Sequence, residues 1–256
     1  MTISVHESAS ASAMVQLFSV RQARNGDYLL DAGLSESEVE ALSACAEWTA
    51  TYPLQRVKKG RRLEAICPMV SPSIAADAMH FTVDRIDDSG NLESIDELLL
   101  RNAKAFHRID PGDDPRLRCL VVVIPGARGQ RLLDATHPDR EIKNELLCQG
   151  ILVGEFFPSC PFATTFNPRL FALRSPAPMY VLRPFIEGDW RFICKVSAWQ
   201  QTYRARFGEP PARLRHLGSP LWRLKEKFRW RIEALRRRFE PGFSASPSSP
   251  DEPISD

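Results

Sequence analysis

Side chains that could bind or act on a small molecule gather in the second half of the sequence. Glu155 lies in the apolar run ILVGEFF, and a carboxylate among apolar residues needs a charged partner to offset its desolvation. Arg174 and Arg183 follow, and a guanidinium fork can bind a carboxylate through two parallel hydrogen bonds. Asn167 adds an amide donor and acceptor. We therefore predict that the two arginines and Asn167 bind a substrate, and that Glu155 acts as a catalytic acid or base or binds an amine.

The same side chains also permit a structural interpretation. Glu155 could form an ion pair with Arg174 or Arg183 that only holds the fold together. If the run that ends in Arg183 is a strand, alternation places this arginine on the face that carries Met179 and Val181. A cation among apolar side chains needs an anionic partner, which Glu155 or a ligand would supply. The sequence leaves both interpretations open.

Thiols and imidazoles are the other groups suited to chemistry. Cys67 precedes Pro68, and its thiolate is a candidate catalytic nucleophile or haem ligand, although a buried structural cysteine is the simpler interpretation. His80 and His137 are the candidate metal ligands, but no HxxxH or HxxE spacing supports a mononuclear zinc or iron site. The six cysteines form no CxxC pair, which favours reduced thiols and a cytoplasmic location.

Helices and strands must position these residues. Apolar runs predict four strands, at 80–86, 118–126, 151–157 and 179–185. Helices are predicted from Ser35, which fits a capping box with Glu38, to about Tyr52, and also over 92–106, 136–150 and 189–207. This order predicts an α+β fold, in which helices cover a mixed four-stranded sheet in a single domain.

The composition changes along the chain. We predict a loose N-terminal arm (1–29), the α+β core domain (30–208), a basic amphipathic helix (209–240) and a disordered tail (241–256). The basic helix, mainly over 219–239, would contact a membrane surface or a protein partner, or it would dock its apolar stripe on the domain. A formal net charge of +2 gives no argument for specific nucleic-acid binding. Among protein partners, a second copy of the same chain, forming a homodimer, is a further alternative.

Three segments together carry a family resemblance: GRRLEAICP, IKNELLCQGILVGEFFP and FNPRLFALRSPAPMYVLRPFIEGDWRFI. They resemble an uncharacterised bacterial family, a domain of unknown function found among biosynthetic genes, over about residues 56–193. Met69 stands where the family pattern has phenylalanine, and Pro184-Phe185 replaces a His-Met pair. The family histidines near the GEF and NP motifs are also missing here, which weakens any metal or haem role for those positions.

The resemblance implies a tailoring enzyme of a small-molecule biosynthetic pathway. More remotely, the layout of a Cys-Pro motif, a central apolar strand and a late Asn-Pro/Arg segment is similar to that of haem-dependent N-oxygenases of guanidino groups. That similarity implies haem as the leading cofactor candidate, an oxidoreductase activity and an amino-acid-like substrate. The alternative is a non-catalytic ligand-binding or assembly module that uses its basic C-terminal helix to contact a partner or a membrane.

Overall fold

The computed structural model describes residues 14–59, 62–86, 92–164, 170–217 and 219. Contacts divide the chain into two compact units, Met1–Ile186 and Glu187–Asp256. The fold is α+β, as the sequence predicted, and its mixed sheet lies in the first unit.

A five-stranded sheet forms the centre of the first unit. Its order is β1-β4-β5-β7-β6, with β1 at Phe18–Ser19, β4 at Met79–Val83, β5 at Cys119–Val123, β7 at Met179–Pro184 and β6 at Ile151–Phe156. Strands β4 and β5 are parallel, whereas the other neighbouring pairs are antiparallel. All four predicted strands are present, and β1 is a fifth that is too short to produce a recognisable apolar pattern. Every residue of the central strand β5 is buried, as expected for its continuous apolar run.

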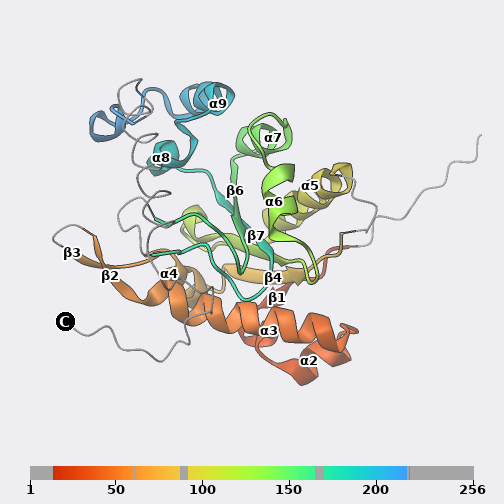
Figure 1. Cartoon of the computed structure of the whole chain (residues 1–256). Helices are drawn as coiled ribbons and strands as arrows, with labels where there is room; N and C mark the ends of the chain where they lie inside the picture. The colour runs from red at the N-terminus through yellow and green to blue at the C-terminus, as the bar shows by residue number, and fades with distance from the viewer. Residues whose placement is uncertain (1–13, 60–61, 87–91, 165–169, 218, 220–256) are drawn as a thin grey trace, which may run out of the picture. The chain divides into compact units, whose positions relative to one another are not determined.

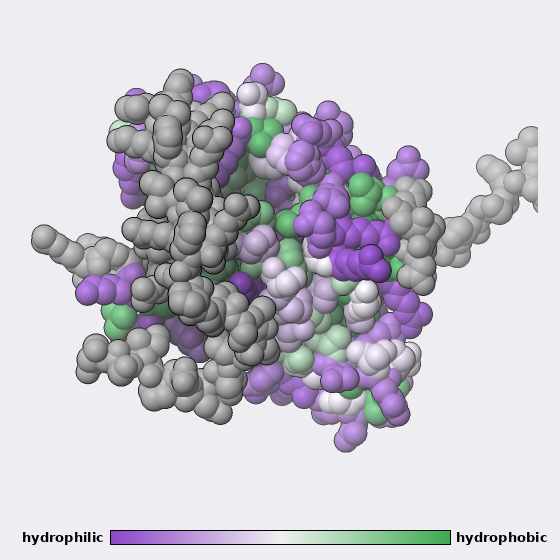
Figure 2. Space-filling model, viewed as in Figure 1, coloured by the Kyte–Doolittle hydropathy of each residue, from purple (hydrophilic) through white to green (hydrophobic). Residues whose placement is uncertain are grey.

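Helices cover both faces of this sheet (Figure 1). Helix α3 (Glu36–Thr51) lies on one face, together with α1 (Val20–Ala23), α2 (Gly26–Asp31) and α4 (Val70–Ala75). The other face carries α5 (Glu93–Arg108), α6 (Gly129–Ala135) and α7 (Ile142–Cys148). We call the two sides the α3 face and the α5–α7 face. The visible surface around α5 is largely hydrophilic, as expected for the outer side of an amphipathic helix (Figure 2).

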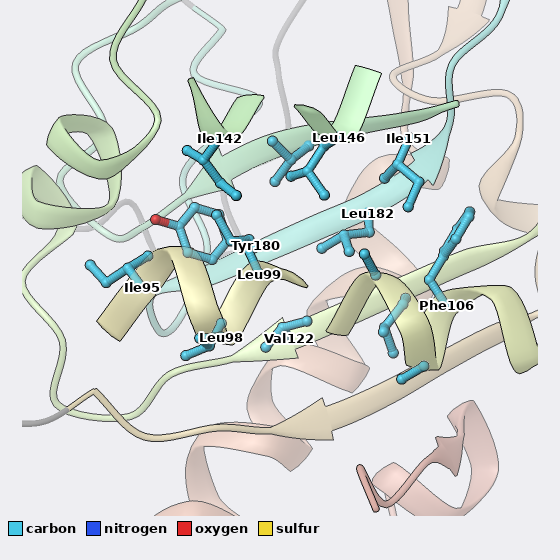
Figure 3. Close-up of a cluster of buried hydrophobic side chains, with 14 of the residues drawn as sticks. Ile95, Leu98, Leu99, Phe106, Val122, Ile142, Leu146, Ile151, Tyr180 and Leu182 are labelled. Atoms are coloured by element: carbon cyan, nitrogen blue, oxygen red, sulfur yellow. The ribbon is translucent and has the colours of Figure 1, made fainter. Parts of the chain in front are cut away.

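The core on the α5–α7 face is built from residues at helical and strand spacing. Ile95, Leu98 and Leu99 of α5 point toward Val122 and Tyr180 of the sheet (Figure 3). Ile142 and Leu146 of α7 close the same cluster over Ile151 and Leu182, and Phe106 lies at its far end. The apolar residues of the helix predicted over 92–106 therefore form the stripe that packs on the sheet.

The start of α3 follows its sequence signal. The carboxylate of Glu38 accepts hydrogen bonds from the backbone N–H of Ser35 at 2.9 Å and from its Oγ at 2.7 Å. The first amide of the helix start is thereby satisfied, in the manner of a capping box. Leu42, Cys45 and Ala46 are fully buried on the inner side of the same helix.

Residues 18–31, most of which were predicted to belong to the loose N-terminal arm, form regular elements in the structure. The segment contains β1, then α1 (Val20–Ala23) and α2 (Gly26–Asp31), and it buries Phe18 and Leu29. These elements are too short to show a helical or strand period, so sequence periodicity could not reveal them. Two further short strands, β2 (Arg56–Lys59) and β3 (Arg62–Ala65), were also not predicted; they pair antiparallel and follow a 3-10 turn at Tyr52–Leu54.

In the second unit, the helix predicted over 189–207 is divided. A 3-10 turn at Glu187–Asp189 leads into α8 (Trp190–Ile193), and α9 runs over Ser197–Phe207. Val196 separates the helices because it adopts an extended backbone, with φ −115° and ψ 122°. Trp190 and Tyr203 pack edge to face, with ring centroids 5.1 Å apart.

Residues 209–217 do not form the start of a long helix; they contain a 3-10 turn at Ala212–Leu214. The remainder of the predicted basic helix, apart from Ser219, and the predicted disordered tail lie outside the described residues. Within the described part of the chain, no helix has the length and apolar character needed to cross a membrane.

Candidate functional site

Glu155 forms an ion pair with Lys143. Its Oε1 atom lies 2.7 Å from Nζ of Lys143, and each side chain is 13 % exposed. One of the two interpretations left open by the sequence paired Glu155 with Arg174 or Arg183, and that choice of partner is wrong. The pair is largely removed from water, and neither charge would be tolerated there without the other.

Two elements position the pair. Glu155 is the fifth residue of β6, and its cross-strand neighbour on β7 is Tyr180. Cross-strand neighbours share a face, so Glu155 projects to the α5–α7 face. Lys143 follows the buried Ile142 in α7, and it lies one turn before the buried Leu147. It therefore flanks the inward stripe of α7 instead of facing solvent.

Tyr180 forms the inner boundary of this region. Its hydroxyl donates a hydrogen bond to the carbonyl oxygen of Leu132 at 3.0 Å, and its ring is fully buried. Burial raises the pKa of Tyr180 well above its ordinary value, and the nearby carboxylates of Glu155 and Asp96 raise this pKa further. Tyr180 therefore remains a neutral hydroxyl with a fixed orientation.

Arg174 approaches the same end of β6 through Cys160. Burial raises the pKa of the Cys160 thiol; the Glu155 carboxylate raises it further, whereas the Arg174 guanidinium lowers it. Nε of Arg174 donates to the carbonyl oxygen of Cys160 at 3.1 Å, and the guanidinium carbon lies 3.9 Å from the centroid of the Phe171 ring. Arg174 thus contacts Cys160 directly, whereas Glu155 influences Cys160 through its charge, and no ion pair between Glu155 and Arg174 is seen among the described residues. We call Lys143, Glu155, Cys160, Arg174 and Tyr180 the β6-end cluster.

Arg183 lies on the other side of the sheet. Arg183 pairs with Leu152 of β6, and Glu155 pairs with Tyr180. Leu152 and Glu155 are three residues apart on the same strand, so their side chains project from opposite faces of the sheet. Arg183 therefore shares the α3 face with Met179 and Val181, as predicted, but it cannot meet Glu155 there. Its Nη1 donates to the carbonyl oxygen of Pro184 at 3.1 Å. Sequence spacing could not reveal this separation, because it depends on the register between two strands that are distant in the chain.

Cys67 is half-buried against the apolar cluster of the α3 face. Cys119 belongs to the same cluster. Burial raises the pKa of Cys119 to about 12, Cys67 raises it further, and Arg183 lowers it. The predicted catalytic residues Cys67 and Glu155 therefore belong to different faces of the sheet.

The two candidate metal ligands do not form a metal centre. His80 is on β4, where burial lowers its pKa and the nearby Asp77 raises it. His137 is exposed in the turn before α7, with its Nδ1 3.2 Å from the carboxylate of Asp139. Among the described residues, no group of three or more His, Cys, Asp or Glu side chains is arranged to hold a metal ion. Asn167 lies outside the described residues.

The residues proposed for haem do not fit a single haem pocket. Cys67 and Arg183 lie on the α3 face, whereas Glu155 lies on the α5–α7 face. Arg174, the second arginine predicted to bind a ligand, already donates to Cys160 and stacks on Phe171. No role at the β6-end cluster is therefore assigned to haem.

Sequence reasoning missed Lys143, Tyr180 and Cys160 as members of the site. A signal for Lys143 was present, because it is adjacent to the apolar positions 142, 146 and 147 that define the inner stripe of α7. A lysine at the edge of such a stripe has its ammonium near the sheet, where the single carboxylate of the following strand is its natural partner.

The carboxylate of Glu155 retains binding capacity. Lys143 is its hydrogen-bond donor at Oε1, and the described residues supply no donor to Oε2. An ionised carboxylate can accept several hydrogen bonds, so Oε2 can bind a donor from a ligand. The arrangement is thus suited to binding an ammonium group or exchanging a proton with it.

The fold and site define an α+β protein with a paired carboxylate and ammonium at the end of a sheet strand. The chain matches the family model described as Domain of unknown function (DUF6875) over residues 42–216, which is more than half of its length. This protein therefore belongs to that family. Searches of curated proteins and of solved structures found no match to the chain.

Proposed function

We propose that this protein is a tailoring enzyme of a small-molecule biosynthetic pathway and that it acts on an amino-acid-like substrate at the β6-end cluster. The main support is the pair formed by Lys143 and Glu155, 2.7 Å apart and 13 % exposed on each side chain. A pair that is largely removed from water adds little net stability compared with apolar residues of the same size. The Oε2 atom of Glu155, which receives no donor from the described residues, is open to a ligand, and this favours a functional role.

Each member of the cluster has a role in this proposal. Glu155 binds the amine of the substrate or takes a proton from it, and Lys143 keeps the carboxylate oriented. Arg174 is held by the Cys160 carbonyl and the Phe171 ring, so it forms a rigid wall with a positive charge. Tyr180, fixed by its hydrogen bond to Leu132, forms the floor.

Turnover tests the proposal directly. Purified protein is incubated with a metabolite extract from cells that lack the gene, and mass spectrometry follows the products. We expect a mass shift that depends on the protein and that Glu155→Gln lowers by about 100-fold or more, as for loss of a catalytic acid or base. Glu145→Gln, an exposed carboxylate on the same helix as Lys143, is the control that should retain activity. A product that forms equally with Glu155→Gln would contradict the proposal.

The remote layout similarity alone implies a haem-dependent oxygenase. Because Cys67 and Arg183 lie on the α3 face whereas Glu155 lies on the α5–α7 face, this version is not part of the proposal.

A second candidate is a non-catalytic assembly module, and the charge distribution favours it. Residues 187–256 contain 14 Lys and Arg against 9 Asp and Glu, and most of this excess lies in 219–239. Such a segment suits an acidic partner or an anionic membrane surface. If this candidate is right, deletion of 210–256 abolishes complex formation and leaves the first unit folded; unchanged association after the deletion would refute it.

A further inference from the structure

We infer that this protein forms a two-fold symmetric homodimer, in which a basic hairpin of each copy binds an acidic patch on the other copy. The basic hairpin consists of β2 and β3 (residues 56–65). The acidic patch consists of exposed carboxylates on α2 and the start of α3, namely Asp27, Asp31, Glu36 and Glu40. Both surfaces belong to the first unit, and neither includes a residue of the β6-end cluster.

Opposite charges are segregated in this part of the chain. Residues 25–55 contain six Asp and Glu and no Lys or Arg, whereas residues 56–62 contain five Lys and Arg and no Asp or Glu. Like charges that are crowded together repel one another, and a surface of the opposite sign offsets this repulsion. Complementary surfaces of this kind give an association its specificity.

The acidic patch is available to a partner. Its four residues are exposed, and none of them forms an ion pair with another described residue. The nearby Glu38 and Glu47, by contrast, are each paired with an arginine. Helix α2 also exposes apolar surface beside these carboxylates, since Tyr28 is 41 % and Leu30 is 47 % exposed. The patch therefore offers both charge and apolar area.

The basic hairpin has matching properties. Arg56 and Lys58 are exposed, and neither forms an ion pair within the described part of the chain. Leu63 is opposite Lys58 in register and is 54 % exposed, so an apolar side chain lies beside the cations on one face of the hairpin. Nη2 of Arg56 donates to the carbonyl oxygen of Leu63 at 3.0 Å, which keeps the guanidinium close to this leucine. An apolar contact surrounded by charged groups is the usual composition of a protein interface.

The hairpin is too far from the acidic patch of its own copy to bind it. Helix α3 lies between them, because α2 is at its start and the hairpin follows its end (Figure 1). The 16 residues of α3 span about 24 Å, whereas a four-residue strand extends over about 13 Å. Backbone hydrogen bonds from Cys67 to Pro53 at 2.9 Å and from Ile66 to Gln55 at 3.0 Å hold the base of the hairpin at the end of α3. The contact therefore requires a second copy.

A two-fold axis allows both contacts to form at once. When a second copy lies antiparallel along α3, its hairpin faces the patch of the first copy, and the hairpin of the first copy faces the patch of the second. The same contact is then made twice and the assembly is closed, as in most homodimers. A nucleic acid or an anionic membrane would also attract the hairpin, but it would repel the acidic patch, so a second copy fits the two surfaces better.

The mass of the full chain in solution tests the inference. Gel filtration with light scattering should show a dimer at about 0.1 M salt. Sedimentation equilibrium should show at least about tenfold weaker dimerisation at about 1 M salt, because the Debye length falls from about 10 Å to about 3 Å. A wild-type protein that is monomeric at low salt would overturn the inference, as would oligomers that grow beyond the dimer.

Two charge-reversed variants test which surfaces meet. Arg56→Glu with Lys58→Glu reverses the hairpin, and Asp27→Lys with Asp31→Lys reverses the patch. Each variant alone should be a monomer with an intact thermal transition, because like charges then face each other. The matched control is Lys104→Glu with Arg128→Glu, which makes the same change in charge at exposed residues outside both surfaces and should remain a dimer.

Mixing the two reversed variants gives the decisive measurement. In a mixed pair each hairpin again faces a patch of the opposite sign, so a one-to-one mixture should form a heterodimer although each variant alone is monomeric. Rescue of this kind excludes a folding defect as the cause of dissociation. Two variants that stay monomeric when mixed, or that stay dimeric when separate, would refute the assigned contact. A monomeric wild type that binds phosphatidylserine vesicles or duplex DNA through the hairpin would assign the hairpin to an external polyanion instead.

Discussion

Two carboxylates of the first unit, Glu155 and Glu38, each form a short contact of 2.7 Å with a cation, yet their surroundings differ. Glu38, at the start of α3, is saturated: Oε1 accepts from Nε of Arg85, and Oε2 accepts from Nη2 of Arg85 and from Ser35. Glu155 accepts from Lys143 at Oε1, and no described residue donates to Oε2.

The partners differ in exposure as well. Arg85 is 76 % exposed, whereas Lys143 is 13 % exposed. The Glu38 pair needs little desolvation of its cation and completes the hydrogen bonds of a helix start, so stability explains it fully. The Glu155 pair desolvates both ions to a large extent, and its Oε2 receives no donor from the described residues. The number of accepted hydrogen bonds therefore separates a structural carboxylate from a candidate functional one better than burial does.

The largest effect is expected when one ion of the Glu155 pair is removed. Lys143→Met leaves a carboxylate with little access to water, and we expect the free energy of unfolding to fall by about 3 kcal/mol. The double change Lys143→Met with Glu155→Met should restore most of this loss. Chemical denaturation measures both. If the single and double variants were equally destabilised, the pair would not be the cause.

A steric change near Glu155 comes next. A Cβ added to Gly129 would lie 2.1 Å from Cδ2 of Phe157, two residues beyond Glu155, so Gly129→Ala must move the Phe157 ring. We expect a loss of about 2 kcal/mol in stability and weaker ligand binding, because the end of β6 shifts. The control is Gly188→Ala, whose added Cβ would meet nothing within 4 Å. A shift in thermal midpoint for Gly188→Ala that matches Gly129→Ala would contradict the steric explanation.

Removal of the Glu38 carboxylate should lower the free energy of unfolding by less than the two changes above, and this effect should depend on pH. The hydrogen bonds from Arg85 and Ser35 lower the pKa of Glu38 from its ordinary value of 4.5 to about 2, against the opposing effect of burial. Between these values the unfolded state binds more protons, so this contribution to stability is complete above pH 4.5 and is lost as the pH falls toward 2. We expect Glu38→Gln to lower stability by about 1.5 kcal/mol at neutral pH and to flatten the acid limb of the stability curve. An unchanged acid limb would show that Glu38 keeps its proton equilibrium on folding.

The smallest effect is expected from the arginine on the opposite face. Because Arg183 does not meet Glu155, Arg183→Met should leave turnover unchanged and alter stability by about 1 kcal/mol or less. The turnover assay and chemical denaturation of the wild type and this variant measure the two effects. Loss of turnover in a folded Arg183→Met variant would contradict the assignment of Arg183 to a separate face.

The sequence predicted the parts of the fold that depend on local pattern. The apolar run at 118–126 contains the central strand β5, and the stripe at 95, 98, 99, 102 and 106 is the buried side of α5. Features determined by pairing between distant segments were not predictable. The face on which Glu155 and Arg183 lie follows from the order and register of β6 and β7, and the partner of Glu155 comes from the helix before it.

The order of the strands has a further consequence, for how the chain folds. The central strand β5 hydrogen-bonds to β4 and β7, and α5 lies in the chain between β4 and β5, while α6, α7 and β6 lie between β5 and β7. No tight hairpin therefore connects β5 to either neighbour, and long loops must close before the sheet can gain its hydrogen bonds. Proteins dominated by such distant contacts fold slowly, so we expect refolding over milliseconds to seconds or longer and a higher soluble yield when synthesis is slowed.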